Sequence, residues 1–258
     1  MENTQIELKT YRAELHLHTV LSPCAAVEMI PPLIIEAAEE KGINLIAVSD
    51  HNSIENISAV MQAAEGTSVT VLPGIELQTR EEIHSLCLFD TLEQITDFYD
   101  LVRPTFPEIH NNIEYFGEQF VVDATGDFVR REERLLIASS SLSLKDAWGL
   151  TANNGGLLIP AHINRPAFGL IPTLGFIPKD IPIEVVEISR HISPEQARVN
   201  FPQIAAYHLI QNGDAHQLNE IIGFNRFLIT EPTIAELKLA FLQTKGRHHE
   251  IFTNRNAK

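Results

Sequence analysis

Two pairs of side chains that commonly bind metal ions stand near opposite ends of the sequence. His16 and His18 are separated by one leucine, and Asp214 and His216 are separated by one alanine. Side chains two residues apart on a β-strand point to the same face of the sheet, so each pair can hold one ion between its members. The spacing therefore predicts two chelating pairs of the kind that bind divalent transition metals.

Further candidates lie between these pairs. His51, Glu76 and His162 each follow a short apolar run, and His84 lies within another. Taken singly, a histidine such as His84 is more often a core or surface residue than a ligand. Asp50 precedes His51 and would face the other side of a strand, so we expect it to support a ligand rather than to bind metal itself. The two chelating pairs favour a shared metal site for the whole set.

Apolar runs alternate with amphipathic helical stretches along the chain. We expect strands at 12–18, 45–49, 69–76, 82–89, 156–162, 183–188 and 207–211, and helices at 30–41, 54–64, 92–102, 144–153 and 233–243. This alternation is typical of βαβ units and a parallel sheet. In a β/α barrel the carboxyl ends of all strands meet at one rim, where active sites are built. The pattern therefore predicts that the candidate ligands converge at one rim.

The length of 258 residues suits a single β/α barrel. We expect this domain to span residues 1–244. The less regular stretch 108–154 is predicted to be an insertion near the barrel mouth that helps to select the substrate. Residues 245–258 are predicted to be a polar tail that frays.

The composition limits the partners and the compartment. The sequence has 19 Lys and Arg against 34 Asp and Glu, a formal net charge of −15, which disfavours nucleic acid as a partner. Only two cysteines are present, and the first residues lack the basic and apolar regions of a signal peptide. We therefore expect a cytoplasmic protein without a membrane role. Nothing in the sequence indicates its oligomeric state.

Taken together and in order, the motifs resemble those of the PHP (polymerase and histidinol phosphatase) family of metal-dependent phosphoesterases. The resemblance covers about residues 12–224, and the motifs that carry it are Glu14-Leu15-His16-Leu17-His18-Thr19, Ser49-Asp50-His51-Asn52, Gly74-Ile75-Glu76, Ile83-His84, Pro160-Ala161-His162 and Gly213-Asp214-Ala215-His216. It implies an α/β fold, a distorted seven-stranded (β/α) barrel of PHP type, which holds two or three divalent metal ions.

The resemblance also implies a set of ligands. The first metal would be held by His16, His18, Glu76 and Asp214. Glu76 would bridge to a second metal, which His84 and His162 complete. A third metal would be held by His51 and His216. Because this set is rich in imidazole, Zn, Mn or Fe suits it better than Mg or Ca, which prefer oxygen ligands.

The sequence departs from the family pattern at three positions. Glu14 stands where the family often has Asp, and we expect it to support the ligands from outside the metal shell. Gly213 stands where the family often has Ser. After Ser22 the family usually supplies an Asp or His ligand, whereas this chain offers Cys24. A Cys24 thiolate is therefore predicted to bind the third metal, with a buried packing thiol as the alternative.

The predicted chemistry is the hydrolysis of a phosphate ester by a metal-bridging hydroxide. The substrate would be a small phosphorylated metabolite or a nucleotide. Asp214 is a candidate to accept the proton of the attacking water. Arg165 could bind a phosphate in a bidentate manner, with a salt bridge that holds the loop as an equal alternative. Arg190 and His191 follow a predicted strand at the same rim and are weaker candidates for substrate binding and catalysis.

Other functions are compatible with a metal-binding barrel. A hydrolase of the amidohydrolase type usually adds a carboxylated lysine at a strand end, and none of the predicted strands ends in lysine. A nuclease is disfavoured by the net charge. A PHP module that binds metal without catalysis is the remaining alternative, and the near-complete set of ligand positions argues against it.

Overall fold

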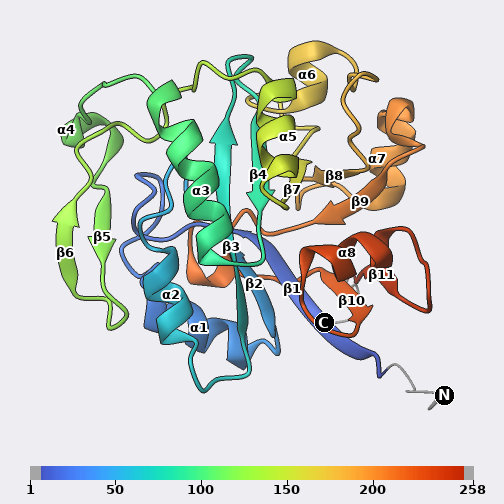
Figure 1. Cartoon of the computed structure of the whole chain (residues 1–258), viewed down its shortest axis with the longest axis horizontal. Coiled ribbons are helices and arrows are strands. Elements are labelled where there is room, and N and C mark those ends of the chain that lie inside the picture. Colours follow the sequence, from blue (N-terminus) through green and yellow to red (C-terminus); the bar gives the residue numbers. More distant parts are fainter. Residues whose placement is uncertain (1–6, 253–258) are drawn as a thin grey trace.

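The computed structural model describes residues 7–252 and shows an α/β fold (Figure 1). Its strands are β1 (Lys9–Leu17), β2 (Leu45–Val48), β3 (Thr70–Gln78), β4 (His84–Leu88), β5 (Phe120–Val122), β6 (Phe128–Arg131), β7 (Leu157–Pro160), β8 (Val185–Ile188), β9 (His208–Gln211), β10 (Asn225–Ile229) and β11 (His248–Ile251). Its α-helices are α1 (Pro31–Glu40), α2 (Ile57–Ala63), α3 (Leu92–Val102), α4 (Ile113–Phe116), α5 (Leu144–Asn153), α6 (Leu170–Leu174), α7 (Pro194–Asn200) and α8 (Ile234–Phe241). Short 3-10 helices lie at Arg103–Thr105, Pro202–Ile204 and Leu218–Glu220.

The strands form a curled sheet that β8 and β9 extend toward a barrel. The main sheet has seven strands in the order β11-β10-β1-β2-β3-β4-β7, and β8 pairs with β9. On one side of this pair, the Ile163 N–H that follows β7 donates to the carbonyl of Glu187 in β8. On the other side, the His18 N–H donates to the carbonyl of Ala215, which follows β9. The seven strands expected from the sequence therefore surround one interior, which confirms the predicted PHP-type barrel.

Among the seven strands expected from the sequence, β4 departs from the parallel arrangement. β4 runs antiparallel to both of its neighbours, β3 and β7. Its first residue, His84, therefore lies at the end of the sheet where β3 and β7 finish. The reversal follows from the short connection between β3 and β4, because parallel neighbours would need a longer crossover.

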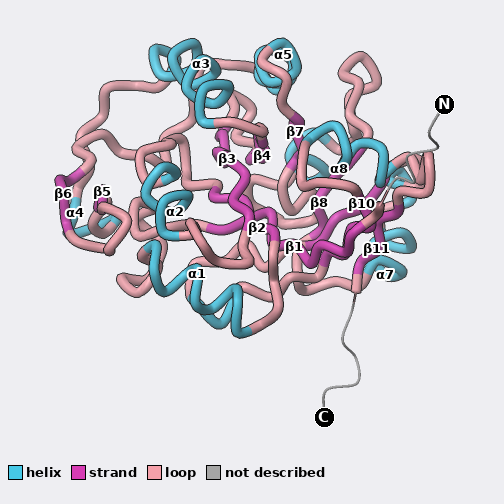
Figure 2. Tube along the Cα trace, turned by 60° about the horizontal axis from the view of Figure 1, so that its bottom comes forward, coloured by secondary structure: helices cyan, strands magenta, loops and turns pink. Residues whose placement is uncertain are grey.

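Alternate residues of the barrel strands pack on opposite sides of the sheet. Leu45 and Ala47 of β2 belong to an inner apolar cluster, whereas Ile46 and Val48 pack beneath the helices. The same division holds in β4, β7, β8 and β9. Figure 2 shows the helices arranged around the central strands. Burial on both faces explains why these strands read as continuous apolar runs in the sequence.

The predicted helices agree with the structure, and local sequence explains where several of them begin. α3 and α5 have the bounds expected from the sequence, and each begins with a capping box, at Thr91 and Ser143 respectively. α1 begins at Pro31, where the missing N–H costs no helical hydrogen bond. Within residues 7–252, no helix is both long and apolar enough to cross a membrane.

The stretch 108–154 contacts the loops at the rim. It contains α4, the antiparallel hairpin of β5 and β6, and α5. The side-chain amide of Asn52 donates to the carbonyls of Leu136 and Ala138 at 2.7 and 3.0 Å. The side-chain amide of Asn56 donates to the carbonyl of Phe120 at 3.0 Å. Two asparagines that follow β2 therefore fix this stretch against the barrel.

The predicted polar tail contains a strand. Residues 248–251 form β11, which pairs antiparallel with β10, so fraying from residue 245 onward is a wrong prediction. Arg247 forms a double ion pair with Glu236 of α8, in which its Nε and Nη2 atoms donate at 3.0 and 2.8 Å. Both side chains are largely buried. The hydrogen bonds from Arg247 lower the pKa of Glu236 to about 2. A buried ion pair therefore anchors a segment that looks polar in the sequence.

We expect the Glu236→Gln variant to lose about 2 kcal/mol of unfolding free energy in urea denaturation at pH 7, because it breaks a charged and buried pair. Glu250 forms an exposed pair with Arg226, so the Glu250→Gln control should change stability by less than about 0.5 kcal/mol. The folded-state pKa of Glu236 lies below its ordinary value of 4.5, so the pair stabilises fully above that pH and loses its effect as the pH falls toward 2. Equal losses in both variants would contradict this anchoring role.

Candidate metal centre

The candidate ligands come from six barrel strands or the residues directly after them, and they meet at one rim. His16 lies in β1 and His18 directly after it, Glu76 lies in β3, and His84 begins β4. His51, His162, Asp214 and His216 lie in the loops after β2, β7 and β9. All of them except Asp214 and His216 are nearly or fully buried. The structure therefore brings together residues that are up to 200 positions apart in the sequence.

A register shift in β1 turns its two histidines toward the rim. Leu15 belongs to the inner apolar cluster, but Leu17 packs beneath the helices. The pairing between β1 and β2 shifts between Glu14 and Leu17, which accounts for this change of side. The imidazole rings of His16 and His18 lie 5.2 Å apart between centroids.

Glu76 lies at the centre of the histidines. Its Oε1 atom lies 3.2 Å from His16 Nε2, 2.9 Å from His84 Nδ1 and 3.2 Å from His162 Nε2. Its Oε2 atom lies 2.9 Å from His51 Nδ1 and 3.5 Å from His18 Nε2. Each carboxylate oxygen thus faces a different group of imidazoles, as a ligand that bridges two ions would require.

Asp214 connects the β1 histidines with Arg165. Its Oδ1 atom lies 3.3 Å from His16 Nε2 and 3.4 Å from His18 Nε2. Its Oδ2 atom accepts a hydrogen bond from Arg165 Nη1 at 2.5 Å. Arg165 therefore forms a salt bridge, the alternative to phosphate binding that we expected for it, and its side chain remains 41% exposed at the rim.

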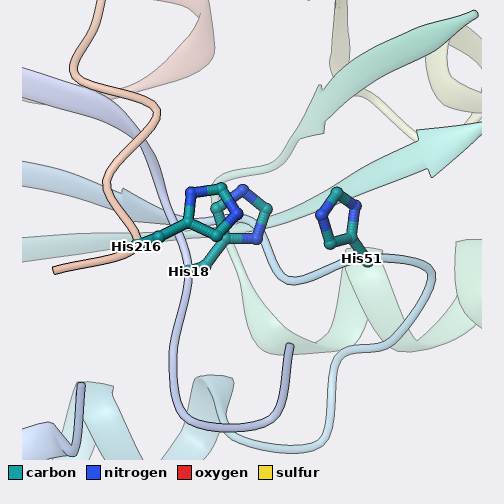
Figure 3. Close-up of side chains that lie close together, drawn as sticks. All are labelled: His18, His51 and His216. Atoms are coloured by element: carbon teal, nitrogen blue, oxygen red, sulfur yellow. The ribbon is translucent and has the colours of Figure 1, made fainter. Parts of the chain in front are cut away.

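His18 and His51 also belong to a further group of imidazoles, which His216 completes. Figure 3 shows His18, His51 and His216 with their rings gathered around one space. The ring centroid of His18 lies 4.1 Å from that of His216 and 4.5 Å from that of His51. Cys24 contacts His216 and His51. Desolvation raises the pKa of the Cys24 thiol, but these hydrogen bonds outweigh it and lower the pKa to about 6.

The donor atoms of these residues fit divalent metal ions. Three groups have ligand atoms within 4.8 Å of one another among the described residues: His18, His51 and His216; His16, His18 and Asp214; and His51, Glu76 and His84. Within residues 7–252, several buried nitrogen and oxygen atoms have no hydrogen-bond partner, and six of them belong to this centre: His16 Nε2, His18 Nε2, His51 Nδ1, Glu76 Oε2, His84 Nε2 and His162 Nδ1. Buried polar atoms rarely lack partners, so this concentration indicates ligand atoms.

The protonation states of the centre depend on its carboxylates. Burial opposes a charge on His16, but Glu187, Asp214 and Glu76 outweigh it and raise the pKa of His16 well above its usual range. Burial raises the pKa of Glu76, but His84, His16 and His51 together lower it far below its usual range. Burial lowers the pKa of His84 to about 4. Since a histidine must be neutral to bind a metal, metal binding here would release protons.

Two carboxylates outside the cluster hold its loops in place. Asp50 is fully enclosed and accepts hydrogen bonds from the Thr19 N–H and from the Ser22 hydroxyl, both at 2.7 Å. The Ser22 hydroxyl also lies 3.1 Å from His18 Nδ1. Asp50 therefore positions the loop of His18, and it is not in the clusters of ligand atoms.

Glu14 has the same kind of role at the other end of the chain. It is fully buried. Its carboxylate accepts the backbone N–H groups of Gly213, Ile222 and Gly223 at 2.8 to 3.1 Å. Burial raises its pKa to about 7 despite these bonds. These hydrogen bonds hold the segment that carries Asp214.

A close backbone contact explains why glycine stands at position 213, directly before Asp214. A Cβ atom at Gly213 would lie only 1.9 Å from the carbonyl oxygen of Glu220. The serine that the family often has at this position therefore cannot be accommodated without moving the backbone of Glu220.

Glu187 is a buried residue of the site that the sequence did not indicate. Its carboxylate lies 3.0 Å from His16 Nδ1, and it accepts hydrogen bonds from the His162 N–H at 2.8 Å and the Asn212 side-chain amide at 2.7 Å. A carboxylate on the far nitrogen of a ligand histidine fixes the orientation of the ring. The available signal was weak, because the predicted strand 183–188 contains two glutamates, Glu184 and Glu187, and the sequence does not distinguish between them.

Arg190 and His191 lie at the same rim but not among the candidate ligands. Both border a cavity of about 370 Å³ that also reaches His162, Asp214 and His216. Arg190 donates to the carbonyl of Gly213 at 2.7 Å and pairs with Glu220 at 2.5 Å. Its guanidinium group is thus engaged within the protein. A second cavity, of about 280 Å³, lies over His51, Glu76 and His84.

Comparison with known proteins identifies the family of the chain and its fold. Residues 14–157 match the model of the PHP domain family. The uncharacterized protein YqxK of Bacillus subtilis strain 168 is 24% identical over an alignment of 268 positions. The alignment covers 90% of this chain and 62% of that protein. The chain thus spans less than two thirds of the length of this curated relative.

Several solved structures share the fold. The lesion-specific endonuclease EndoQ of Pyrococcus furiosus superimposes with a TM-score of 0.74 at 20% identity, over 93% of this chain and 58% of that one. A protein from Bifidobacterium adolescentis assigned as a metal-dependent phosphoesterase has a TM-score of 0.55 at 18% identity, over 82% of this chain and 90% of that one.

One of the similar structures is a complex with a nucleic-acid duplex. An endonuclease Q structure with a 27-mer duplex substrate has a TM-score of 0.72 at 21% identity, over 93% of this chain and 58% of that one. The expectation from net charge that nucleic acid is a disfavoured partner is therefore not supported. With the family model matching more than half of the sequence and the barrel agreeing, the chain belongs to the PHP domain family.

Proposed function

We propose that this protein is a metal-dependent phosphoesterase that hydrolyses a small phosphorylated metabolite or a nucleotide. The observation that carries the proposal is the buried Glu76 carboxylate, with five imidazoles within 3.5 Å of its two oxygens. Such a centre would be held by His16, His18, Glu76 and Asp214, by His84 and His162, and by His51, His216 and Cys24. Its imidazole-rich composition favours Zn, Mn or Fe.

Asp214 and Arg165 have separate roles in the proposed reaction. Bound divalent cations supply an activated water at neutral pH and offset the negative charge that builds up on phosphorus. Asp214 has one oxygen toward the β1 histidines and is 20% exposed, so it is placed to receive a proton from water at the rim. Burial opposes its charge, but His16 and His18 outweigh this and hold the pKa of Asp214 far below its usual range, so it would pass that proton on rather than keep it. Arg165 borders both cavities and can contact a phosphate while it remains beside Asp214.

The cavities favour a small substrate. They have volumes of about 370 and 280 Å³ and share Cys24, His162, Arg165, Asp214 and His216. Each lies near the lower end of the range for small-molecule sites. Arg190 and His191 border the larger one, where a second polar group of the substrate would lie.

A nuclease activity is the second candidate, because EndoQ shares the fold. Within residues 7–252 the arginines of the exposed hairpin, Arg130 and Arg131, pair with Glu55 and Glu118. Since these cations are neutralised within the protein, the hairpin offers little attraction for a phosphate backbone. We therefore place the nuclease second.

Removal of metal should abolish hydrolysis of phosphate monoesters. Protein treated with a chelator should lose at least about tenfold in rate, and Mn or Zn should restore it, because without cations the centre would not activate water at neutral pH. Phosphate release and elemental analysis of the same samples provide the measurement. Activity that survives complete metal removal would refute the proposed chemistry.

The Glu76→Gln variant should lose metal and activity together. Glutamine keeps the shape of the side chain but lacks the charge that two ions would share, so we expect the loss of one or more metal equivalents and a fall in rate of about 100-fold. Glu65→Gln, at an exposed position, is the matched control and should keep both. Normal metal content with normal turnover in Glu76→Gln would show that Glu76 is not a bridging ligand.

Cys24 is exposed, so the buried packing thiol that was the alternative for this residue is a wrong prediction, and substitution should show whether the thiol binds metal. Cys24→Ser should lose one metal equivalent, and Cys24→Asp should recover it in part with a shift toward Mn, because a carboxylate is a harder ligand than a thiolate. Cys87 is buried away from the centre, so Cys87→Ala should keep the metal count. If both Cys24 variants retain the wild-type count and selectivity, the third site depends on the histidines alone.

A further inference from the structure

An aromatic ring beside the candidate metal centre has no role in the proposed mechanism. Phe168 lies in the loop between β7 and α6 and is 37% exposed. It borders the 280 Å³ cavity together with His51, Glu76 and His84. Its ring lies parallel to the His84 imidazole, with 4.4 Å between centroids and 9° between planes. A large apolar surface is thus presented directly beside the ligands.

The backbone of Phe168 is unusual for an aromatic residue. Its φ angle is +60°, in the left-handed region that non-glycine residues rarely adopt. The Phe168 carbonyl accepts a hydrogen bond from the His84 N–H at 3.1 Å. Unfavourable backbone conformations of this kind persist where the surrounding structure imposes them, and they are concentrated at functional sites.

The loop that carries Phe168 is rigid. A Cβ atom at Gly169 would lie 2.3 Å from the carbonyl oxygen of Arg165, so the chain folds closely upon itself there. The Asn164 side chain exchanges two hydrogen bonds with Ser189, at 2.8 and 2.9 Å. These contacts restrain the backbone on both sides of Phe168, and the stacked His84 imidazole contacts one face of its ring.

A second apolar side chain borders the same cavity. Ile137 is held in place because Asn52 donates to the carbonyls on either side of it, at Leu136 and Ala138. Arg165 lies where this cavity meets the larger, polar one. The cavity thus combines two apolar side chains with a neighbouring cation. This is the environment of a flat ring attached to a phosphate.

We infer that Phe168 is a specificity-determining residue that stacks on a planar ring of the substrate alcohol. This inference rests on the proposed phosphoesterase function and narrows its substrates to nucleotide-like esters. The volume of about 280 Å³ suits one ring system rather than an oligomer. Stacking on an aromatic face tolerates any base, so the residue would select for a base without selecting among bases.

Two esters that differ only in the base test this inference. We expect the protein loaded with Mn to have a kcat/KM for adenosine 5′-monophosphate about tenfold above that for ribose 5-phosphate. Phe168→Leu should remove most of this preference by raising KM for the nucleotide, with ribose 5-phosphate changed less than about twofold. Phe168→Tyr should keep it, because the aromatic face remains. Phe176→Leu is the control, since Phe176 is 58% exposed and outside both cavity linings.

Metal analysis and calorimetric binding of both esters distinguish the outcomes. An unchanged preference in Phe168→Leu overturns the inference. A loss of metal with equal loss of both activities also overturns it, because Phe168 would then only support His84. If neither ester is hydrolysed, the proposed function fails for these substrates, and binding decides the inference: tighter binding of the nucleotide that depends on Phe168 upholds it, and equal or absent binding refutes it.

Discussion

The Glu76 carboxylate is buried among five imidazoles, and the rest of the rim is arranged to make this possible. A buried charge is unfavourable unless it is paired, and Glu76 has no lysine or arginine partner among the described residues. In the absence of metal it depends on protonated histidines, as the raised pKa values of His16 and His51 indicate. Cations would replace those protons. Metal binding would therefore be coupled to the release of these protons and would weaken as the pH falls.

The loops around Glu76 adopt conformations that only a well-anchored barrel can maintain. Asn52, His162 and Asp214 all have positive φ angles, and each directly follows or belongs to the candidate ligands. Buried hydrogen bonds offset this cost. Asn52 bonds to the stretch 108–154, His162 donates its N–H to Glu187, and the segment of Asp214 is held by Glu14. The unusual backbone and the buried polar anchors are therefore parts of one arrangement that precedes substrate binding.

The strands and the convergence of most candidate ligands at one rim could be predicted from the sequence because both rest on local patterns. Burial of each strand on two faces leaves an apolar run, and His16 and His18 show the two-residue spacing directly. Other features depend on tertiary contacts and leave no such pattern. Glu187 acts through a histidine 171 residues away, and β11 exists because β10 and the buried pair of Arg247 and Glu236 hold it. The direction of β4 was not predictable from apolar periodicity, which is the same for parallel and antiparallel strands.

Net charge was the least informative property of the sequence for judging partners. The value of −15 describes the whole surface, whereas a substrate experiences the field at the rim. Several of the acidic residues, including Glu14, Asp50 and Glu187, are buried and bonded within the protein, so they contribute little to a surface field. Each bound divalent cation would further reduce the negative charge exactly where a phosphate must approach. The approach of an anionic ester therefore depends on metal loading and on Arg165, and these local groups can attract phosphate to a protein that is acidic overall.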